Sequence, residues 1–165
     1  MLGKFLVLCA SFVVASGMSG AQASVQVSTA SLNAPRPLND ETRNAAIHDY
    51  LASWRCMSEA LAQNRIDLLD ADFVGTARSR LGNTIRNQTA LGLSTHYEDR
   101  SHKIQVLFYS PEGLSIELAD TADYDIHVIA HGKELANHTE VARYIVVLTP
   151  SEVRWRVRVF QGIPQ

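Results

Sequence analysis

The hydrophobic period changes once along this chain of 165 residues, and that change limits the available folds more than any other feature. Before Gly92, apolar residues recur with the spacing of one face of an α-helix. After Gly92, stretches rich in Val, Ile, Tyr and Phe alternate with polar positions, as half-buried strands do. Helices followed by a meander of strands predict a single α+β domain, in which N-terminal helices pack on an antiparallel sheet.

The longest helix is predicted from Asp40 to Gln63. Asn39 or Asp40 can cap its start, and Asn64 can end it. Its apolar face is formed by Ile47, Tyr50, Leu51, Trp54, Met57 and Leu61.

Ile66, Leu68 and Leu69 lead into a second helical region, with Asp70 or Asp72 as the expected cap. Its buried side would be formed by Phe73, Val74, Ala77 and Leu81. Gly82 is expected to end or bend it, and one more short helix is expected over residues 85–91. Strands are predicted at residues 103–109, 114–118, 124–130, 140–148 and 153–161, with a break around 120–123. The polar stretch at residues 96–102, HYEDRSH, is interpreted as a loop before the first of these strands.

The N-terminus is interpreted as an export signal. Lys4 supplies a positive charge, residues 5–15 form a short apolar core, and Ala21-Gln22-Ala23 matches an A-x-A cleavage pattern. The apolar run is too short for a stable membrane span. The sequence therefore predicts a periplasmic or secreted protein, with an uncleaved amphiphilic N-terminus as the alternative. The predicted organisation is a signal peptide at 1–23, a flexible lead-in at 24–39 and one domain at 40–161, with Val25 and Val27 able to add a short strand.

Charge and cysteine content narrow the range of functions. Cleavage after Ala23 would remove only Lys4 among the charged residues and leave 14 basic against 17 acidic side chains. A net charge of −3 argues against general nucleic-acid binding. Cys9 would leave with the signal, so Cys56 would remain alone, and we interpret it as a small buried apolar residue.

No metal or cofactor is expected from the sequence. His127 and His131 are four residues apart, but on a strand this spacing puts them about 13 Å from each other, too far for one ion. The sequence has no zinc-binding or phosphate-binding motif and no Ser/His/Asp signature.

The stretch VRWRVRVF, residues 153–160, alternates arginine with apolar residues. A turn at 149–152 would place Leu148 opposite Val153. That register puts Tyr144, Val146, Trp155 and Val157 on one apolar face, and Arg143, Arg154, Arg156 and Arg158 on the other with Ile145 and Val147. Three interpretations of the arginine face stay open: a solvated face neutralised by acids, an anion site, or a surface for a partner protein. The neutralising acids would be Glu117, Asp120, Asp123 and Asp125.

Proton-transfer chemistry has three candidate residues, Tyr50, Asp99 and Asp125. A tyrosine and an aspartate in an apolar pocket can act as acid and base once their pKa values are shifted. No spacing in the sequence forces these residues together, and a solvated loop is the alternative for the region of Asp99.

The stretches YLASWRCMSEAL, LLDADFVGTARSRL and ARYIVVLTPSEVRWRVRVF resemble the nuclear transport factor 2-like superfamily. This superfamily includes SnoaL-like and ketosteroid isomerase-like enzymes as well as non-catalytic domains. The details are most similar to the IMS domains of plastid and cyanobacterial division proteins. The resemblance implies a long helix and two shorter ones, packed in the concave face of a curved sheet. It also implies that the arginine face points outward or forms a dimer contact.

Two functions follow as expectations. The first is an exported, non-catalytic binding or assembly domain, which holds a protein partner, a second copy or a small apolar ligand. Its binding residues would be Arg143, Tyr144, Arg154, Trp155, Arg156 and Arg158. The alternative is a small pocket enzyme of the same fold: an isomerase, a dehydratase or a cyclase.

Overall fold

The computed structural model of this protein describes residues 23–28 and 36–164. Nearly all of the predicted signal peptide, residues 1–22, lies outside the described residues, as do residues 29–35 of the predicted lead-in. The elements are β1 (Ser24–Ser28), α1 (Asp40–Gln63), the 3-10 helix η1 (Ile66–Asp70), α2 (Gly75–Ala90), β2 (Leu93–Tyr109), β3 (Ile116–Ala130), β4 (Lys133–Pro150) and β5 (Trp155–Ile163).

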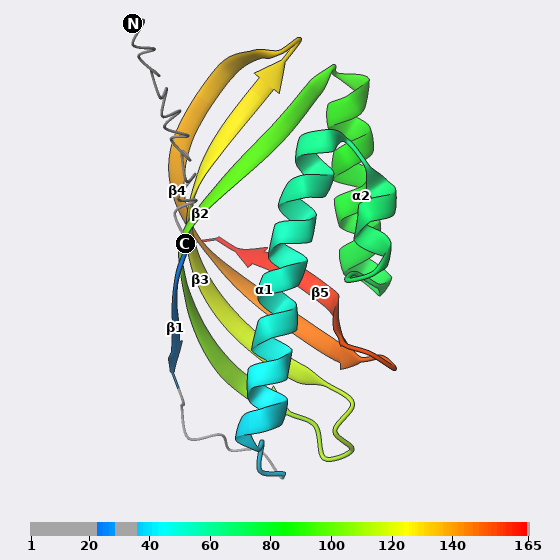
Figure 1. The fold of residues 1–165 in the computed structure, drawn as a ribbon, viewed down its shortest axis with the longest axis vertical. Helices are drawn as coiled ribbons and strands as arrows, with labels where there is room; N and C mark the ends of the chain where they lie inside the picture. Colours follow the sequence, from blue (N-terminus) through cyan, green and yellow to red (C-terminus); the bar gives the residue numbers. More distant parts are fainter. Residues whose placement is uncertain (1–22, 29–35, 165) are drawn as a thin grey trace, which may run out of the picture.

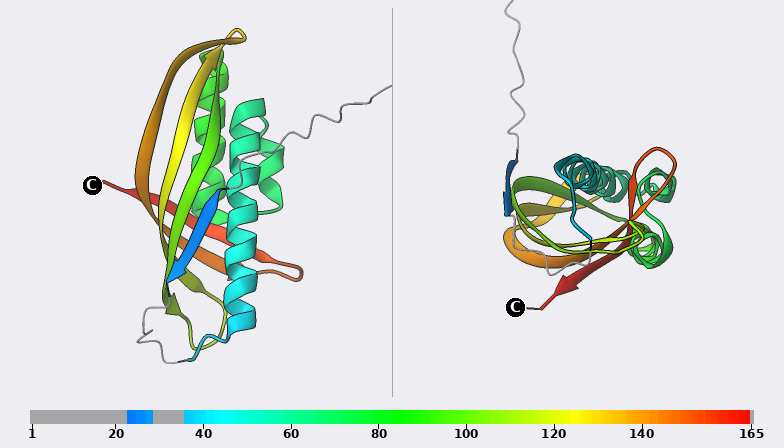
Figure 2. Two further views of the ribbon diagram at one scale, coloured as in Figure 1. Left: turned by 60° about the vertical axis from the view of Figure 1, so that its left-hand side comes forward. Right: turned by 90° about the horizontal axis from the view of Figure 1, so that it is seen from below.

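The five strands form one sheet in the order of the chain, with β1 parallel to β2 and every other neighbouring pair antiparallel. Helices α1 and α2 cover one face of this sheet (Figure 1). Seen from below, the sheet curves around the helical layer, and β1 lies at its edge beside β2 (Figure 2). This arrangement confirms the predicted α+β fold class, with helices packed on a curved and mostly antiparallel sheet.

Helix α1 has the bounds that the sequence predicts. The Asn39 side chain caps it by accepting a 2.8 Å hydrogen bond from the backbone N–H of Thr42. Asn64 ends it in the left-handed conformation, with φ 55°. Asparagine suits the N-cap because its side-chain oxygen can accept a hydrogen bond from a backbone N–H in the first turn. It suits the C-terminal end because it adopts the left-handed conformation more readily than most other residues.

The prediction for the second helical region was wrong in two respects. Helix α2 runs unbroken through Gly82, and its N-cap is Val74, without a side-chain cap. Gly82 is buried, and a Cβ atom there would lie 3.1 Å from Arg78 Nη1 and 3.5 Å from Ile66 Cγ2. The glycine therefore allows close packing against η1 and does not break the helix.

The strands are longer than predicted. The expected loop at 96–102 lies inside β2, and β3 continues through 120–123 without a break. Strand β4 begins at Lys133 and not near Glu140. These stretches looked irregular because they are polar, but several of their polar side chains face partners in the interior, as described below. In the predicted lead-in, Ser24–Ser28 pairs with residues 101–105 of β2 as strand β1.

The predicted register of β4 against β5 was also wrong. Leu148 pairs with Val157 and Arg143 pairs with Ile163. The turn comes later than expected, because β4 continues to Pro150 and Ser151 N donates to Arg154 O at 2.8 Å. Apolar alternation shows which side chains of one strand are buried but not which residues of the next strand lie opposite them. The observed register differs from the predicted one by four residues at Leu148 and by five at Arg143, because a register shift between Val147 and Leu148 adds one residue to β5 and turns Phe160 toward Trp54. Val146, Leu148 and Val157 are indeed fully buried.

We predict that Asn39→Ala lowers the free energy of unfolding by about 1 kcal/mol, because the first turn of α1 loses its side-chain acceptor. Urea unfolding monitored by circular dichroism measures this change. Asn44→Ala is the matched control, since Asn44 is exposed within the same helix. An equal loss in both variants would contradict a capping role for Asn39.

Candidate functional site

Trp54 of α1 fills the centre of the space between helices and sheet. It is only 1% exposed. Four rings surround the indole, with centroid distances of 5.0 Å to His102, 5.4 Å to Tyr144, 5.6 Å to Phe160 and 5.7 Å to Tyr124. These rings come from β2, β3, β4 and β5, so one side chain contacts four strands of the sheet.

A group of polar side chains lies beside this indole, and we call it the interior polar cluster. Its members are Tyr50, Trp54, Asp99, His102 and Asp120. The Tyr50 hydroxyl donates to Asp120 Oδ2 at 2.7 Å, and His102 Nδ1 lies 2.7 Å from the same oxygen. On the other side, Trp54 Nε1 donates to Asp99 Oδ1, and His102 Nε2 lies 3.7 Å from Asp99 Oδ2.

The backbone explains why these residues meet. Tyr50 and Trp54 are four residues apart and therefore share one face of α1. Asp99 and His102 would point to opposite faces of a regular strand, because they are three residues apart. A register shift in β2 between Asp99 and Ser101 adds one residue and brings both side chains to the helix-facing side.

Burial and charge set the protonation of the cluster. Burial by itself would lower the pKa of His102, but its hydrogen bonds to Asp120 and Asp99 and the charges of both carboxylates raise that pKa to about 9. Burial, followed by the charge and hydrogen bond of Asp120, raises the pKa of Tyr50 well above its ordinary value. At neutral pH the cluster therefore holds a neutral phenol and a protonated imidazole. Asp120 Oδ1 is buried and has no hydrogen-bond partner among the described residues.

Three tyrosines, Tyr97, Tyr124 and Tyr144, lie next to one another on the far side of the indole. The hydroxyls of Tyr124 and Tyr144 lie 2.6 Å apart, and the rings of Tyr97 and Tyr124 are 5.4 Å apart. Burial raises the pKa of all three phenols, to about 12 for Tyr97. They remain neutral hydrogen-bonding groups at any physiological pH.

The structure brings together only part of the predicted catalytic set. Tyr50 and Asp99 belong to the interior polar cluster. Asp125 does not, because it pairs on the opposite side of the sheet with Arg100 at 3.3 Å and Thr139 at 2.5 Å. Sequence reasoning missed the roles of His102 and Asp120. Asp120 had a usable signal, because it continues the alternation of the buried residues Ile116 and Leu118.

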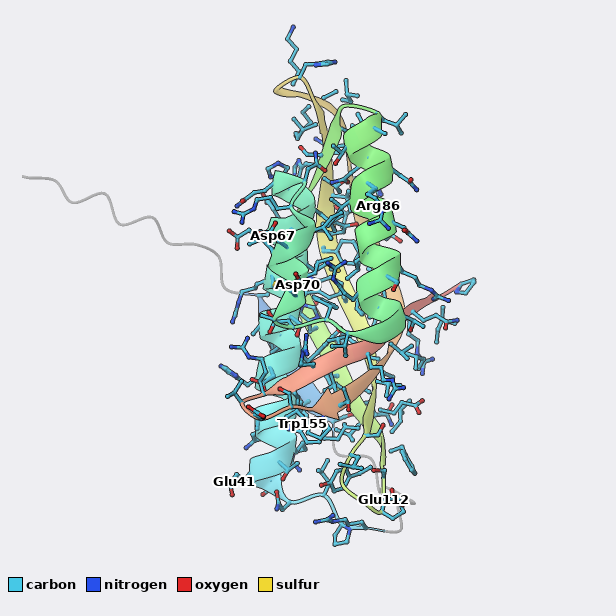
Figure 3. All side chains as sticks on the ribbon, turned by 90° about the vertical axis from the view of Figure 1, so that its right-hand side faces the viewer. Glu41, Asp67, Asp70, Arg86, Glu112 and Trp155 are labelled. Atoms are coloured by element: carbon cyan, nitrogen blue, oxygen red, sulfur yellow. The ribbon has the colours of Figure 1, made fainter. Side chains whose placement is uncertain are left out.

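The predicted arginine face does not form as a single row. Arg154 donates to Asp72 at 2.7 Å, and Arg156 donates to the backbone carbonyls of Asp70 and Phe73. Both arginines therefore hold β5 against the connection between η1 and α2. Figure 3 shows the β5 ribbon, which begins at Trp155, next to this connection. Three of the four acids expected to neutralise the row have other partners: Asp120 lies in the interior, and Asp123 and Asp125 pair with Arg100.

The remaining predicted binding residues lie in two environments. Arg143 and Arg158 are exposed. Tyr144 and Trp155 are partly buried and pack against the core, where the resemblance places them. The Trp155 backbone N–H donates to Asp49 Oδ2 at 2.8 Å and ties β5 to α1.

Two hollows lie outside the interior. The first, which we call the outer-sheet groove, has a volume of about 460 Å³. It is lined by Gln26, Val27, Ser28, Lys103, Ile104, Gln105, Ala119, Thr121 and Arg143. The second, which we call the β5 crevice, has a volume of about 380 Å³. It is lined by Asp70, Ala71, Ser151, Glu152, Val153, Arg154 and Arg156.

Within residues 23–28 and 36–164, no group of three or more His, Cys, Asp or Glu side chains could hold a metal ion. His127 Nδ1 instead lies 2.8 Å from Glu134. In the same part of the chain, no helix has the length and apolar character needed to cross a membrane.

Cys56 is half-buried, and its thiol donates a hydrogen bond to the Leu68 carbonyl. Burial and a hydrogen bond to Asp72 raise the pKa of this thiol to about 12.

Comparison with known proteins identifies the fold. No protein-family model matches the sequence, and no curated protein matches it. Among solved structures, the intermembrane space region of the chloroplast protein ARC6 superposes with a TM-score of 0.64 at 13% identity, over 79% of this chain and 100% of that one. A scytalone dehydratase-like protein from Novosphingobium aromaticivorans DSM 12444 superposes with a TM-score of 0.52 at 13% identity, over 76% of this chain and 89% of that one.

These similarities show the fold, which is a nuclear transport factor 2-like, SnoaL-like cone. They confirm the fold that the resemblance in the sequence motifs implies. The two shorter helices that it implies are here η1 and α2.

The interior polar cluster predicts how stability depends on pH. The pKa of His102 rises from 6.5 to about 9 on folding, so its contribution is fully present below pH 6.5 and is lost as the pH rises through 9. Across this window we expect the free energy of unfolding to fall by up to about 3 kcal/mol. Urea unfolding at intervals from pH 6 to pH 10 measures the slope.

His102→Gln should flatten this slope, whereas His127→Gln should leave most of it in place. His127 is the matched control because its pKa is also raised, by a hydrogen bond to Glu134, at a solvated position. A steep slope that survives in His102→Gln would show that the pH dependence has another origin.

Proposed function

We propose that this protein is an exported, non-catalytic binding or assembly domain that holds its ligand or partner on the outside of the cone. The observation that carries the proposal is the filling of the interior by Trp54. Enzymes that use an interior pocket need room for a substrate next to their acid and base. Here the indole occupies that room and is in contact with four other rings.

The polar groups of the interior support the same proposal. Tyr50, His102 and Asp120 are no more than 2% exposed. Most of their hydrogen-bonding groups are used by one another, and Trp54 Nε1 is bonded to Asp99. A substrate would have to displace the indole and break that bond, and both changes cost stability.

A small pocket enzyme is the second candidate, favoured by one observation. Asp120 Oδ1 is buried without a hydrogen-bond partner among the described residues, next to His102 and Tyr50. A carboxylate with a free oxygen beside a protonated imidazole could move a proton on a bound substrate. The fold similarity to the scytalone dehydratase-like protein is compatible with such a role. This candidate requires the interior to open.

Quenching of tryptophan fluorescence by acrylamide separates the two candidates. The chain has two tryptophans, so Trp155→Phe reports on Trp54 alone. We expect Trp54 in the folded protein to be quenched several-fold less than in urea, because its ring is shielded from small solutes. The matched variant Trp54→Phe reports on the partly buried Trp155 and should be quenched more strongly.

Quenching of Trp54 in the folded protein that approaches the value in urea would contradict a closed interior. It would favour the enzyme. Native mass spectrometry of protein purified from its own host shows whether a small molecule is bound. A bound molecule whose removal changes the fluorescence of Trp54 would also contradict the proposal, because it would lie inside the cone.

The exported location rests on residues 1–23, with their single lysine, short apolar run and A-x-A pattern. We predict that these residues direct a fused alkaline phosphatase, which is active only outside the cytosol, to an active state. A fusion that begins at Ser24 is the first control, and Val13→Asp with Val14→Asp in the full signal is the second. A stable but inactive fusion carrying the unmodified segment would contradict export.

A further inference from the structure

We infer that the outer-sheet groove is a binding site for a small hydrophilic anion, a molecule that carries a phosphate or a carboxylate group. The inference rests on the proposed function, because it assigns a ligand class to a site outside the cone. Three features of the groove carry it: the alignment of two cations, the small residues between them, and the absence of acidic residues from the lining.

The two cations stand on either side of β3. Lys103 of β2 pairs with Thr121 of β3, and Thr121 pairs in turn with Arg143 of β4. Neighbouring strands are about 4.8 Å apart, so the Cα atoms of Lys103 and Arg143 are separated by about 10 Å. Both side chains line the same groove, and both are long enough to reach one group held above Thr121.

Small side chains make the hollow. Ala119 and Thr121 form its floor, between the longer side chains of the neighbouring strands. Strand β1 supplies one wall, where Gln26 pairs with Lys103 and Ser28 pairs with Gln105. The resulting volume of about 460 Å³ fits a small molecule, and the amide and hydroxyl groups of the wall suit a hydrophilic body.

The electrostatic environment favours an anion. None of the residues that line the groove is acidic. Across the described part of the chain, neither Lys103 nor Arg143 forms an ion pair, whereas Arg78, Arg100 and Arg154 do. Glu117 and Asp123 lie on the same face of β3, but neither lines the groove, and Asp123 is next to Arg100.

Each cation contributes something different. The planar guanidinium of Arg143 can donate two parallel hydrogen bonds to a phosphate or a carboxylate. Lys103 adds a point charge on the other side, and the Thr121 hydroxyl lies between them. A row of this kind can bind an anion without any movement of the sheet, because all three positions lie in paired strands.

Backbone amide NMR tests the inference on the purified protein. Inorganic phosphate and citrate are titrated separately at constant ionic strength, with chloride as the replacement anion. We expect saturable shifts at the amides of Lys103, Gln105, Thr121 and Arg143 with at least one of the two. The comparison tells which anionic group the groove prefers.

The double variant Lys103→Gln with Arg143→Gln should weaken this binding about tenfold or more, since both charge-assisted contacts are lost. Lys133→Gln with Arg80→Gln is the matched control. It removes the same charge from exposed positions outside the groove and should leave the affinity unchanged. Both variants replace exposed side chains, and the dispersion of the amide spectrum confirms that each one is folded.

Two results would overturn the inference. The first is that neither phosphate nor citrate causes saturable shifts at the amides of the groove. The second is that the two double variants lose affinity equally, which would indicate attraction by net charge alone. Neither result affects the proposed function as long as Trp54 stays shielded from acrylamide. Saturable shifts at Trp54 and His102 with none in the groove would instead contradict both, because the anion would then enter the cone.

Discussion

One indole, packed inside the curved sheet, joins the helical layer to four of the five strands. Trp54 reaches from α1 to rings on β2, β3, β4 and β5, so the distance between helix and sheet is set by the size of that side chain. Its N–H is bonded to Asp99, which satisfies the one polar atom of an otherwise apolar side chain. In this protein the space between the helices and the curved sheet is occupied by Trp54 and the rings around it.

The polar residues of the interior follow from the same constraint. A charged group inside a protein is tolerated when it is paired, and His102 lies between Asp99 and Asp120. The bulge in β2 is what makes this arrangement possible, because it turns Asp99 and His102 to the same side. Tyr50 and Trp54 then connect the carboxylates to α1, so the cluster aligns the long helix with two strands.

The binding site that we propose lies outside this filled interior. There the arginines divide into two kinds. Arg154 and Arg156 hold β5 to the segment between η1 and α2, and their charges are used within the fold. Arg143 has no such partner among the described residues and lines a groove together with Lys103. The alternating arginines of the sequence therefore serve mainly to hold the fold together. The two cations that line the groove are Arg143, which the sequence analysis named as a binding residue, and Lys103, which no local sequence pattern connects to it.

Local signals in the sequence were enough to predict the bounds and caps of α1, the change from helical to strand period, the fold class, and the buried side of β4 and of the first residues of β5. Each depends on side chains within a few residues of one another. Two members of the site, Tyr50 and Asp99, could be chosen as candidates, but His102 and Asp120 could not be joined to them. Tertiary contacts were needed to establish the register of β5, the bulge in β2, the pairing of β1 and the unbroken path of α2 through Gly82. Alternation within one strand shows neither which residue of the next strand lies opposite nor where an extra residue is inserted, as it is in β5 next to Val147 and Leu148. Both depend on contacts between residues far apart in the chain, such as Arg154 with Asp72 and Trp155 with Asp49.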